Sequence, residues 1–182
     1  MLNQTEAIDT LKKGGIIAYP TEAVFGLGCD PDNLASVTRL LSIKKRPSNK
    51  GLILIAASWE QLQPYLKFPT DAQLKTLMRS WPGPVTWLVP ARDTVSALVK
   101  GEHTTLAVRI TAHPIARELC QQFNKPLIST SANYLSEPPC RSAEEVAEVF
   151  KNEIDYIVQG ETNSLARPTE IRDLLSGKIV RG

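Results

Sequence analysis

Lys44-Lys45-Arg46-Pro47-Ser48-Asn49-Lys50-Gly51 leads directly into the apolar run Leu52-Ile53-Leu54-Ile55-Ala56. Apolar side chains at three- and four-residue spacing before this stretch predict a helix that Asn33 caps. Pro47 ends the helical pattern, Gly51 turns the chain, and the apolar run predicts a buried strand. Four cations within seven residues, between a helix and a strand, are typical of an anion site in an α/β protein. A solvated, charged helix end accounts for the same residues equally well.

Helical and strand patterns alternate on both sides of this stretch. Helical patterns cover residues 6–13, 71–79, 114–123 and 143–150, and strand patterns cover 16–19, 85–89, 106–110, 127–130, 156–158, 170–172 and 178–180. The alternation predicts an α/β fold with α+β character, in which helices flank a twisted sheet of mixed parallel and antiparallel strands. The length of 182 residues predicts a single domain over residues 1–182.

Composition narrows the classes of function. The net charge of +2 is too small for a protein that coats nucleic acid, so any anion binding must come from a local patch. Cys29, Cys120 and Cys140 are far apart and form no C-x-x-C, which argues against a metal cluster and predicts free thiols in a cytoplasmic protein. The N-terminus lacks the features of a signal peptide, and no apolar run approaches the roughly 20 residues of a membrane span.

A dense polar cluster follows one predicted strand, where Ser129-Thr130-Ser131-Ala132-Asn133 comes directly after Pro126-Leu127-Ile128. Ligands of α/β proteins gather at the carboxyl ends of strands, and small polar residues let backbone N–H groups approach a phosphate. The same residue types also favour helix caps and Asx turns, so a purely structural role remains open.

Two further segments carry polar residues at strand ends. Tyr19-Pro20-Thr21-Glu22-Ala23 ends a strand, and Phe25-Gly26-Leu27-Gly28 after it reads as a plain turn or a backbone approach to a ligand. In residues 105–109, strand alternation places Thr105 and Arg109 on one face. A buried arginine needs an anionic partner, so Arg109 indicates either a ligand cleft or a structural salt bridge.

Taken together, these segments resemble the YrdC family. The family's K-x-R and S-x-N motifs stand here as Lys44-Lys45-Arg46 and Ser131-Ala132-Asn133. The flanking segments Tyr19-Pro20-Thr21-Glu22, Trp81-Pro82-Gly83-Pro84 and Ala107-Val108-Arg109 also fit. The resemblance covers essentially the whole chain, whose length matches the short bacterial form, and it implies the YrdC-like fold with a concave basic cleft.

The resemblance implies L-threonylcarbamoyladenylate synthase activity, a nucleotidyl transfer. Such enzymes join L-threonine, bicarbonate or CO2, and ATP into threonylcarbamoyl-AMP and release pyrophosphate. Mg²⁺ is expected with ATP, with no metal bound by the protein itself. Proteins of the threonylcarbamoyl-transfer complex are expected partners for tRNA modification, and direct binding of tRNA or double-stranded RNA is a further expectation.

The resemblance also implies which residues form the site. Lys44 and Arg46 would be catalytic, and the ATP site would comprise Arg46, Lys50, Thr105, Ser131, Asn133 and Arg181. The threonine pocket would comprise Thr21, Arg109, Ser129 and Thr169. The chain departs from the family at Gly51, where many members have proline, at Ile55, where longer homologues have histidine, and at Leu135-Ser136, which replaces Ser-Gly.

Two other functions compete with this interpretation. A binding module for double-stranded RNA or tRNA, without catalysis, would use the same basic patch at residues 44–50 but has no use for a small hydroxyl-lined cavity. A hydrolase with Ser131 as nucleophile is disfavoured, because the chain has no G-x-S-x-G elbow and its two histidines offer little choice of base.

Overall fold

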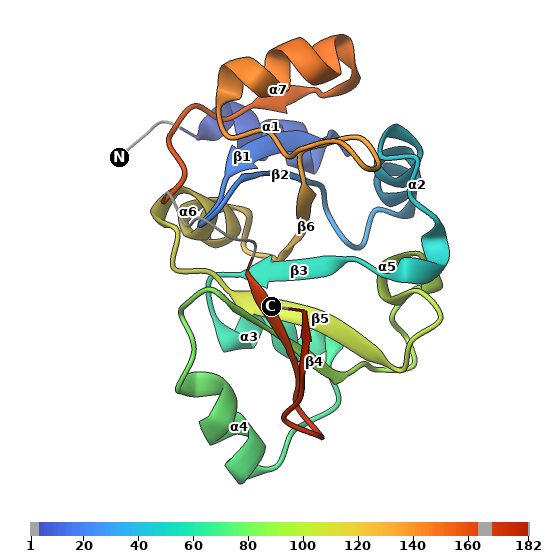
Figure 1. The fold of residues 1–182 in the computed structure, drawn as a ribbon, viewed down its shortest axis with the longest axis vertical. Coiled ribbons are helices and arrows are strands. Elements are labelled where there is room, and N and C mark those ends of the chain that lie inside the picture. Colours follow the sequence, from blue (N-terminus) through green and yellow to red (C-terminus); the bar gives the residue numbers. More distant parts are fainter. Residues whose placement is uncertain (1–3, 164–168, 182) are drawn as a thin grey trace.

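The protein is described by a computed structural model that covers residues 4–163 and 169–181. Over these residues the strands form one nine-stranded sheet in the order β7-β1-β2-β6-β3-β5-β4-β8-β9 (Figure 1). The strands are β1 (Ile17–Pro20), β2 (Phe25–Gly28), β3 (Ile53–Ala56), β4 (Val85–Pro90), β5 (Thr105–Ile110), β6 (Leu127–Ser131), β7 (Tyr156–Ile157), β8 (Glu170–Asp173) and β9 (Ile179–Arg181). The predicted domain also includes residues 1–3, 164–168 and 182, which lie outside the described residues.

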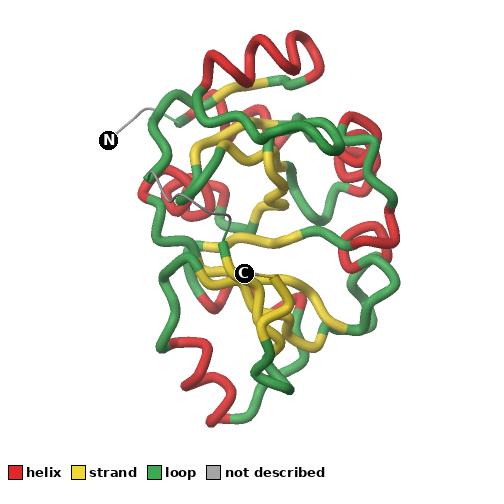
Figure 2. Tube along the Cα trace, viewed as in Figure 1, coloured by secondary structure: helices red, strands yellow, loops and turns green. Residues whose placement is uncertain are grey.

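The sheet is mixed, as the alternation of short elements predicted. Strand β1 runs parallel to β7, β3 parallel to β5, and β4 parallel to β8. The other neighbours in the sheet pair antiparallel. Strand β6 lies between β2 and β3 and joins the two halves of the sheet. Loops and helices connect the strands along the chain (Figure 2).

Helices cover both faces of the sheet. They are α1 (Thr5–Lys12), α2 (Leu34–Ile43), α3 (Trp59–Leu62), α4 (Asp71–Met78), α5 (Ala97–Lys100), α6 (Pro114–Phe123) and α7 (Ala143–Phe150), with 3-10 turns η1 (Ser48–Lys50), η2 (Gln63–Tyr65) and η3 (Lys151–Glu153). Helices α1 and α6 bury their apolar sides in one hydrophobic cluster, and α2 and α7 bury theirs in the other. Along β3, Leu54 belongs to the second cluster and Ile55 to the first, as the two-residue period of a strand requires.

One predicted turn is wrong, because residues 25–28 form strand β2 rather than a turn. The glycines of this strand resemble those of a turn, so the pattern of apolar side chains did not predict a strand. Glycine is nevertheless needed at position 28. A Cβ at Gly28 would lie 2.2 Å from the carbonyl oxygen of Ile128 and 2.9 Å from the Tyr19 ring. Tyr19 fills that space and donates a 2.9 Å hydrogen bond to the same carbonyl, so the glycine lets β1, β2 and β6 pack closely.

Several smaller predictions are confirmed. Asn33 caps α2 by accepting a 3.2 Å hydrogen bond from the Ser36 amide. The three cysteines are buried free thiols. Within residues 4–163 and 169–181, none of the helices has the length and apolar character that crossing a membrane requires.

The packing of the core predicts how the protein responds when a buried side chain of β3 is shortened. Leu54 is fully buried at the centre of the sheet, so Leu54→Ala should lower the free energy of unfolding by about 2–5 kcal/mol, through lost burial and the cavity left behind. Leu175, 65% exposed, supplies the control, because Leu175→Ala should change it by less than about 0.5 kcal/mol. Urea denaturation measures both values, and equal losses would contradict this placement of the core.

Candidate functional site

A cavity of about 310 Å³ opens beside β6, where the pairing of that strand changes. The antiparallel pairing of β6 with β3 ends at Ser129, whereas its pairing with β2 continues to Ser131. The side of Thr130 and Ser131 away from β2 is therefore left open, and both residues line the cavity. The site thus lies at the carboxyl end of β6, where the sequence predicted a polar cluster.

Lys44, the C-cap of α2, holds the loop that follows β6. Its buried ammonium donates to the carbonyl oxygens of Ser131 at 2.5 Å and Asn133 at 2.6 Å, and to the side-chain oxygen of Asn133 at 2.9 Å. An ammonium has three N–H donors, so all of them are committed to this loop. Ser131 adds a 2.7 Å hydrogen bond from its hydroxyl to Asn133 Oδ1. The K-x-R and S-x-N motifs therefore meet through Lys44 and Asn133.

Arg46 also lines the cavity, close to the residues that lead into β3. Its Nη2 donates a 2.8 Å hydrogen bond to the carbonyl of Gly51, and its Nε has no hydrogen-bond partner among the described residues. Gly51 has a φ of +62°, a conformation that glycine adopts without strain. A second cavity of about 230 Å³ shares Arg46 and Arg181 with the first and adds Lys50 and Thr105.

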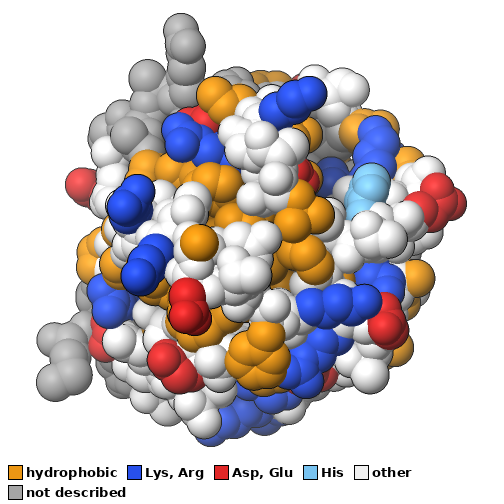
Figure 3. Space-filling view, turned by 90° about the horizontal axis from the view of Figure 1, so that it is seen from below, with side chains coloured by type: hydrophobic (Ala, Val, Ile, Leu, Met, Phe, Trp, Pro, Cys, Tyr) orange, Lys and Arg blue, Asp and Glu red, His pale blue; other side chains and the backbone are white. Residues whose placement is uncertain are grey.

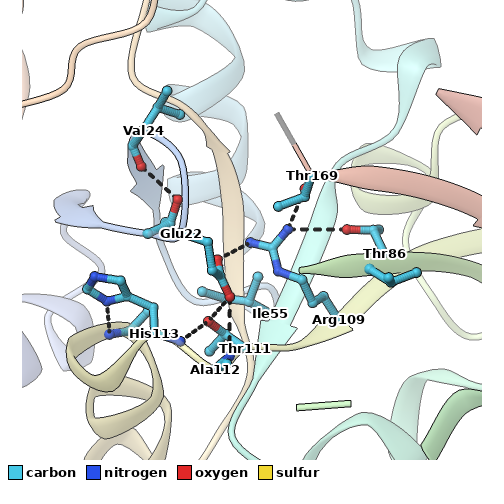
Figure 4. Close-up of polar contacts among 12 residues, drawn as sticks. Glu22, Val24, Ile55, Thr86, Arg109, Thr111, Ala112, His113 and Thr169 are labelled. Atoms are coloured by element: carbon cyan, nitrogen blue, oxygen red, sulfur yellow. Dashed lines mark hydrogen bonds and ion pairs between the residues drawn. The ribbon is translucent and has the colours of Figure 1, made fainter. Parts of the chain in front are cut away.

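Arg109 forms the floor of the first cavity and is held from three elements (Figure 4). Its Nη2 lies 3.2 Å from Glu22 Oε2, and the two side chains are only 4% and 3% exposed. Its Nη1 donates to the hydroxyls of Thr169 at 2.7 Å and Thr86 at 3.2 Å. Burial raises the pKa of Glu22, but the Arg109 charge and the hydrogen bond from Thr111 outweigh it, so the pKa lies below its ordinary value.

Positive charge dominates the cavity, since Arg46, Arg109 and Arg181 all line it. Burial first, and then the charges of Arg109 and Arg46, lower the pKa of Arg181. Its guanidinium is held by a 3.2 Å hydrogen bond to the carbonyl of Thr169. Guanidinium groups crowded in this way favour a ligand that carries negative charge.

The structure brings the residues of the predicted site together. One cavity is lined by Thr21, Arg46, Arg109, Ser129, Ser131, Asn133, Thr169 and Arg181. Lys50 and Thr105 line the adjoining cavity instead, and Lys44 lies behind the wall on the Ser131 loop. Of the departures from the family, Ile55 is fully buried in the apolar cluster with α6, and Leu135 is exposed.

Sequence reasoning assigned no function to Glu22, Thr86 or Thr111, although all three are buried around Arg109. A signal for Glu22 was present, because a buried arginine requires an anionic partner and Glu22 directly follows Thr21. His113, the N-cap of α6, is buried, and its Nε2 lies 3.0 Å from the carbonyl of Glu161. Burial lowers the pKa of His113.

We expect Lys44 to titrate near pH 8. Burial, and then the charge of Arg46, lower its pKa from 10.5 to about 8. Because the unfolded chain holds this proton more tightly, the contribution of Lys44 to the free energy of unfolding becomes more favourable as the pH rises from about 8 to about 10.5. NMR of ¹³Cε-labelled lysine measures the midpoint, and Lys44→Met assigns the signal by removing it. A midpoint near 10.5 would contradict this environment.

Known proteins are similar to this chain in both sequence and fold. A family model for Sua5, YciO and YrdC, described as "Telomere recombination", matches residues 9–182. A protein of Aliivibrio fischeri named threonylcarbamoyl-AMP synthase is 50% identical, over 100% of this chain and 99% of its own length. Among solved structures, E. coli YciO has 25% identity and a TM-score of 0.84, with 96% of this chain and 86% of that chain covered.

P. abyssi Sua5 complexed with L-threonine has 33% identity and a TM-score of 0.88 over 95% of this chain. The present chain spans about half of that protein, 51% of its length. The match of the family model over nearly the whole chain, together with the relative at 50% identity, confirms the resemblance read from the two motifs. The chain belongs to the Sua5/YciO/YrdC family.

Proposed function

We propose that this protein is an L-threonylcarbamoyladenylate synthase, a nucleotidyltransferase. The observation that carries the proposal is a cavity lined by Arg46, Arg109 and Arg181 that continues into a second one beside Lys50. The carboxylate of an amino acid and the phosphates of a nucleoside triphosphate both fit a site with this charge. The relative of the same length with 50% identity is named threonylcarbamoyl-AMP synthase, which supports the proposal.

The amino acid would occupy the inner part of the cavity. Arg109 offers N–H donors for its carboxylate, and the hydroxyls of Thr21, Ser129 and Thr169 line the same space. Thr21 and Ser129 are both more than 90% buried, so a ligand polar group there exchanges water for fixed partners. The complex of P. abyssi Sua5 with L-threonine supports this choice of substrate.

ATP would occupy the outer part and the second cavity. Arg46, Lys50 and Arg181 would bind its phosphates, and Thr105, Ser131 and Asn133 would contact the nucleotide. No group of three or more His, Cys, Asp or Glu side chains among the described residues could hold a metal ion. Mg²⁺ would therefore enter with the substrate, as MgATP.

The chemistry would proceed in two steps. The neutral amine of L-threonine attacks the carbon of CO2 and releases a proton to solvent, or attacks bicarbonate, whose hydroxide leaves with the amine proton as water; either route gives a carbamate. A carbamate oxygen then attacks the α-phosphorus of ATP, the bond to the β-phosphate oxygen breaks, and pyrophosphate leaves. Both reactants are anions, so Arg46 and Arg181 would lower the barrier by neutralising their charge. Lys44 would act by holding the Ser131 loop in place.

The product would serve the threonylcarbamoyl modification of tRNA through partner proteins in the cytoplasm. We also propose that residues 1–182 act as one domain, since strands from both ends of the chain complete the same sheet.

An RNA-binding module without catalysis is the alternative. On the end of the molecule shown in Figure 3, basic side chains are interspersed with apolar and acidic ones. Arg109 and the hydroxyls around it suit the carboxylate of a small ligand better than they suit RNA. Thermal unfolding distinguishes the two functions, because ATP plus L-threonine should raise the melting temperature more than RNA does.

The decisive test is the reaction itself. Incubation with MgATP, L-threonine and bicarbonate should yield the mass of threonylcarbamoyl-AMP together with pyrophosphate. L-alanine in place of L-threonine is the control for the hydroxyl contacts. Absence of the product with L-threonine would overturn the proposed function.

Arg46→Ala should separate catalysis from folding. The variant removes a charge at the phosphate side, so pyrophosphate release should fall by on the order of 100- to 1000-fold. The folded protein should persist, because Arg46 makes only one described hydrogen bond within the chain. Arg79, exposed at the end of α4, provides the matched control as Arg79→Ala. Near-normal turnover in Arg46→Ala would remove Arg46 from the catalytic site.

A further inference from the structure

Glu22 is a buried carboxylate beside the cavity that no step of the proposed reaction uses. It lies in the loop after β1, next to Thr21, and does not itself line the cavity. Its Oε1 accepts hydrogen bonds from the Thr111 hydroxyl at 2.7 Å and from the Ala112 amide at 3.2 Å. Its Oε2 lies 3.2 Å from Arg109 Nη2 and has no hydrogen-bond partner of suitable geometry among the described residues. One oxygen is therefore fixed by the chain, and the other faces Arg109.

The donors of Arg109 can be assigned one by one. A guanidinium has five N–H groups. Both N–H groups of Nη1 go to the hydroxyls of Thr86 and Thr169. One N–H of Nη2 faces Glu22, and Nε has no partner among the described residues. Because Nε is fully buried as well, one donor, the second N–H of Nη2, remains for a ligand.

Stability alone gives a poor reason for this ion pair. Burying two charges costs several kcal/mol per ion, and apolar residues of similar volume often stabilise a protein as well or better. The pair does, however, fix a guanidinium that would otherwise have several rotamers. Thr111 ties Glu22 to the start of α6 as well, because its hydroxyl accepts a 3.1 Å hydrogen bond from the His113 amide. These contacts fix the orientation of the Arg109 guanidinium (Figure 4).

We propose that Glu22 is a positioning residue, which orients Arg109 so that the free N–H of its Nη2 receives the carboxylate of the amino-acid substrate. The proposal rests on the function proposed above and deepens it. Glu22 also balances the charge of Arg109 before the substrate binds, without competing for the remaining N–H of Nη2. The effect should therefore be confined to ligands with a carboxylate and should leave the nucleotide half of the site unchanged.

Glu22→Gln tests the proposal, with binding measured by calorimetry. The variant keeps the shape and an acceptor for Thr111 but presents an uncharged group to Arg109. The Kd for L-threonine should rise roughly 10- to 100-fold, as for a misplaced binding group. The weaker binding of L-threoninamide, which lacks the carboxylate, and the binding of ATP should change less than about twofold. If Glu22 only stabilised the fold, Glu22→Gln would weaken the binding of L-threonine, L-threoninamide and ATP together.

Variants of Thr111 keep the test informative if Glu22→Gln folds poorly. Thr111→Val removes the hydroxyl that orients Glu22 and should shift the Kd for L-threonine in the same direction by a smaller factor, whereas Thr111→Ser should not. Asp155→Asn is the matched control for loss of a carboxylate, because Asp155 pairs with Arg39 and with the Ile16 amide away from the cavity.

The outcomes separate this proposal from the proposed function. If the wild-type protein binds L-threonine and Glu22→Gln binds it equally well or more tightly, the positioning role is overturned and the synthase function stands. Equal loss of L-threonine, L-threoninamide and ATP binding also overturns it. If the wild-type protein binds neither L-threonine nor ATP, the proposed function falls and this role falls with it.

Discussion

The cost of crowding guanidinium groups governs how this site is built. Arg46, Arg109 and Arg181 line one cavity, where mutual repulsion and loss of water both oppose their charge. Each is held by an oxygen of the chain: Gly51 and Thr169 offer backbone carbonyls to Arg46 and Arg181, and Glu22 offers a carboxylate to Arg109. The fold therefore supplies one full negative charge against three positive ones. In the proposed reaction, the negatively charged groups of the substrates would neutralise the remaining charge.

Much of the fold could be predicted from local sequence patterns, and the one turn that was predicted wrongly has a physical cause. Helices α6 and α7 have the predicted bounds, because proline or serine marks their starts and their apolar spacing is regular. Strand β2 was read as a turn, because its glycines resemble a loop in isolation. Glycine at position 28 is required by the Tyr19 ring and the Ile128 carbonyl, which other strands bring close to it. Such a requirement depends on tertiary packing and leaves no periodic signal in the sequence.

The site shows the same division between local and distant information. The residues carried over from the K-x-R and S-x-N motifs lie around adjoining cavities, and their roles remain predictions. Sequence reasoning also stated that Arg109 needs an anionic partner, but it could not choose between a ligand and a carboxylate of the chain. The structure provides Glu22 and still leaves one N–H of Arg109 Nη2 for a ligand. Likewise, Lys44 looked like a free cation, whereas its three donors are bound to the loop after β6.

The order of strands in the sheet has a consequence for how the chain is made. Strand β1 pairs with β7, and β2 with β6, so the hairpin formed first keeps both edges unpaired until late segments arrive. At synthesis rates of roughly 5–20 residues per second, β7 follows β1 out of the ribosome only after on the order of ten seconds. Pairings between distant segments also slow folding, because loop closure must precede them. The nascent N-terminal half is thus the part of this protein most exposed to aggregation, and the part for which a chaperone would matter most.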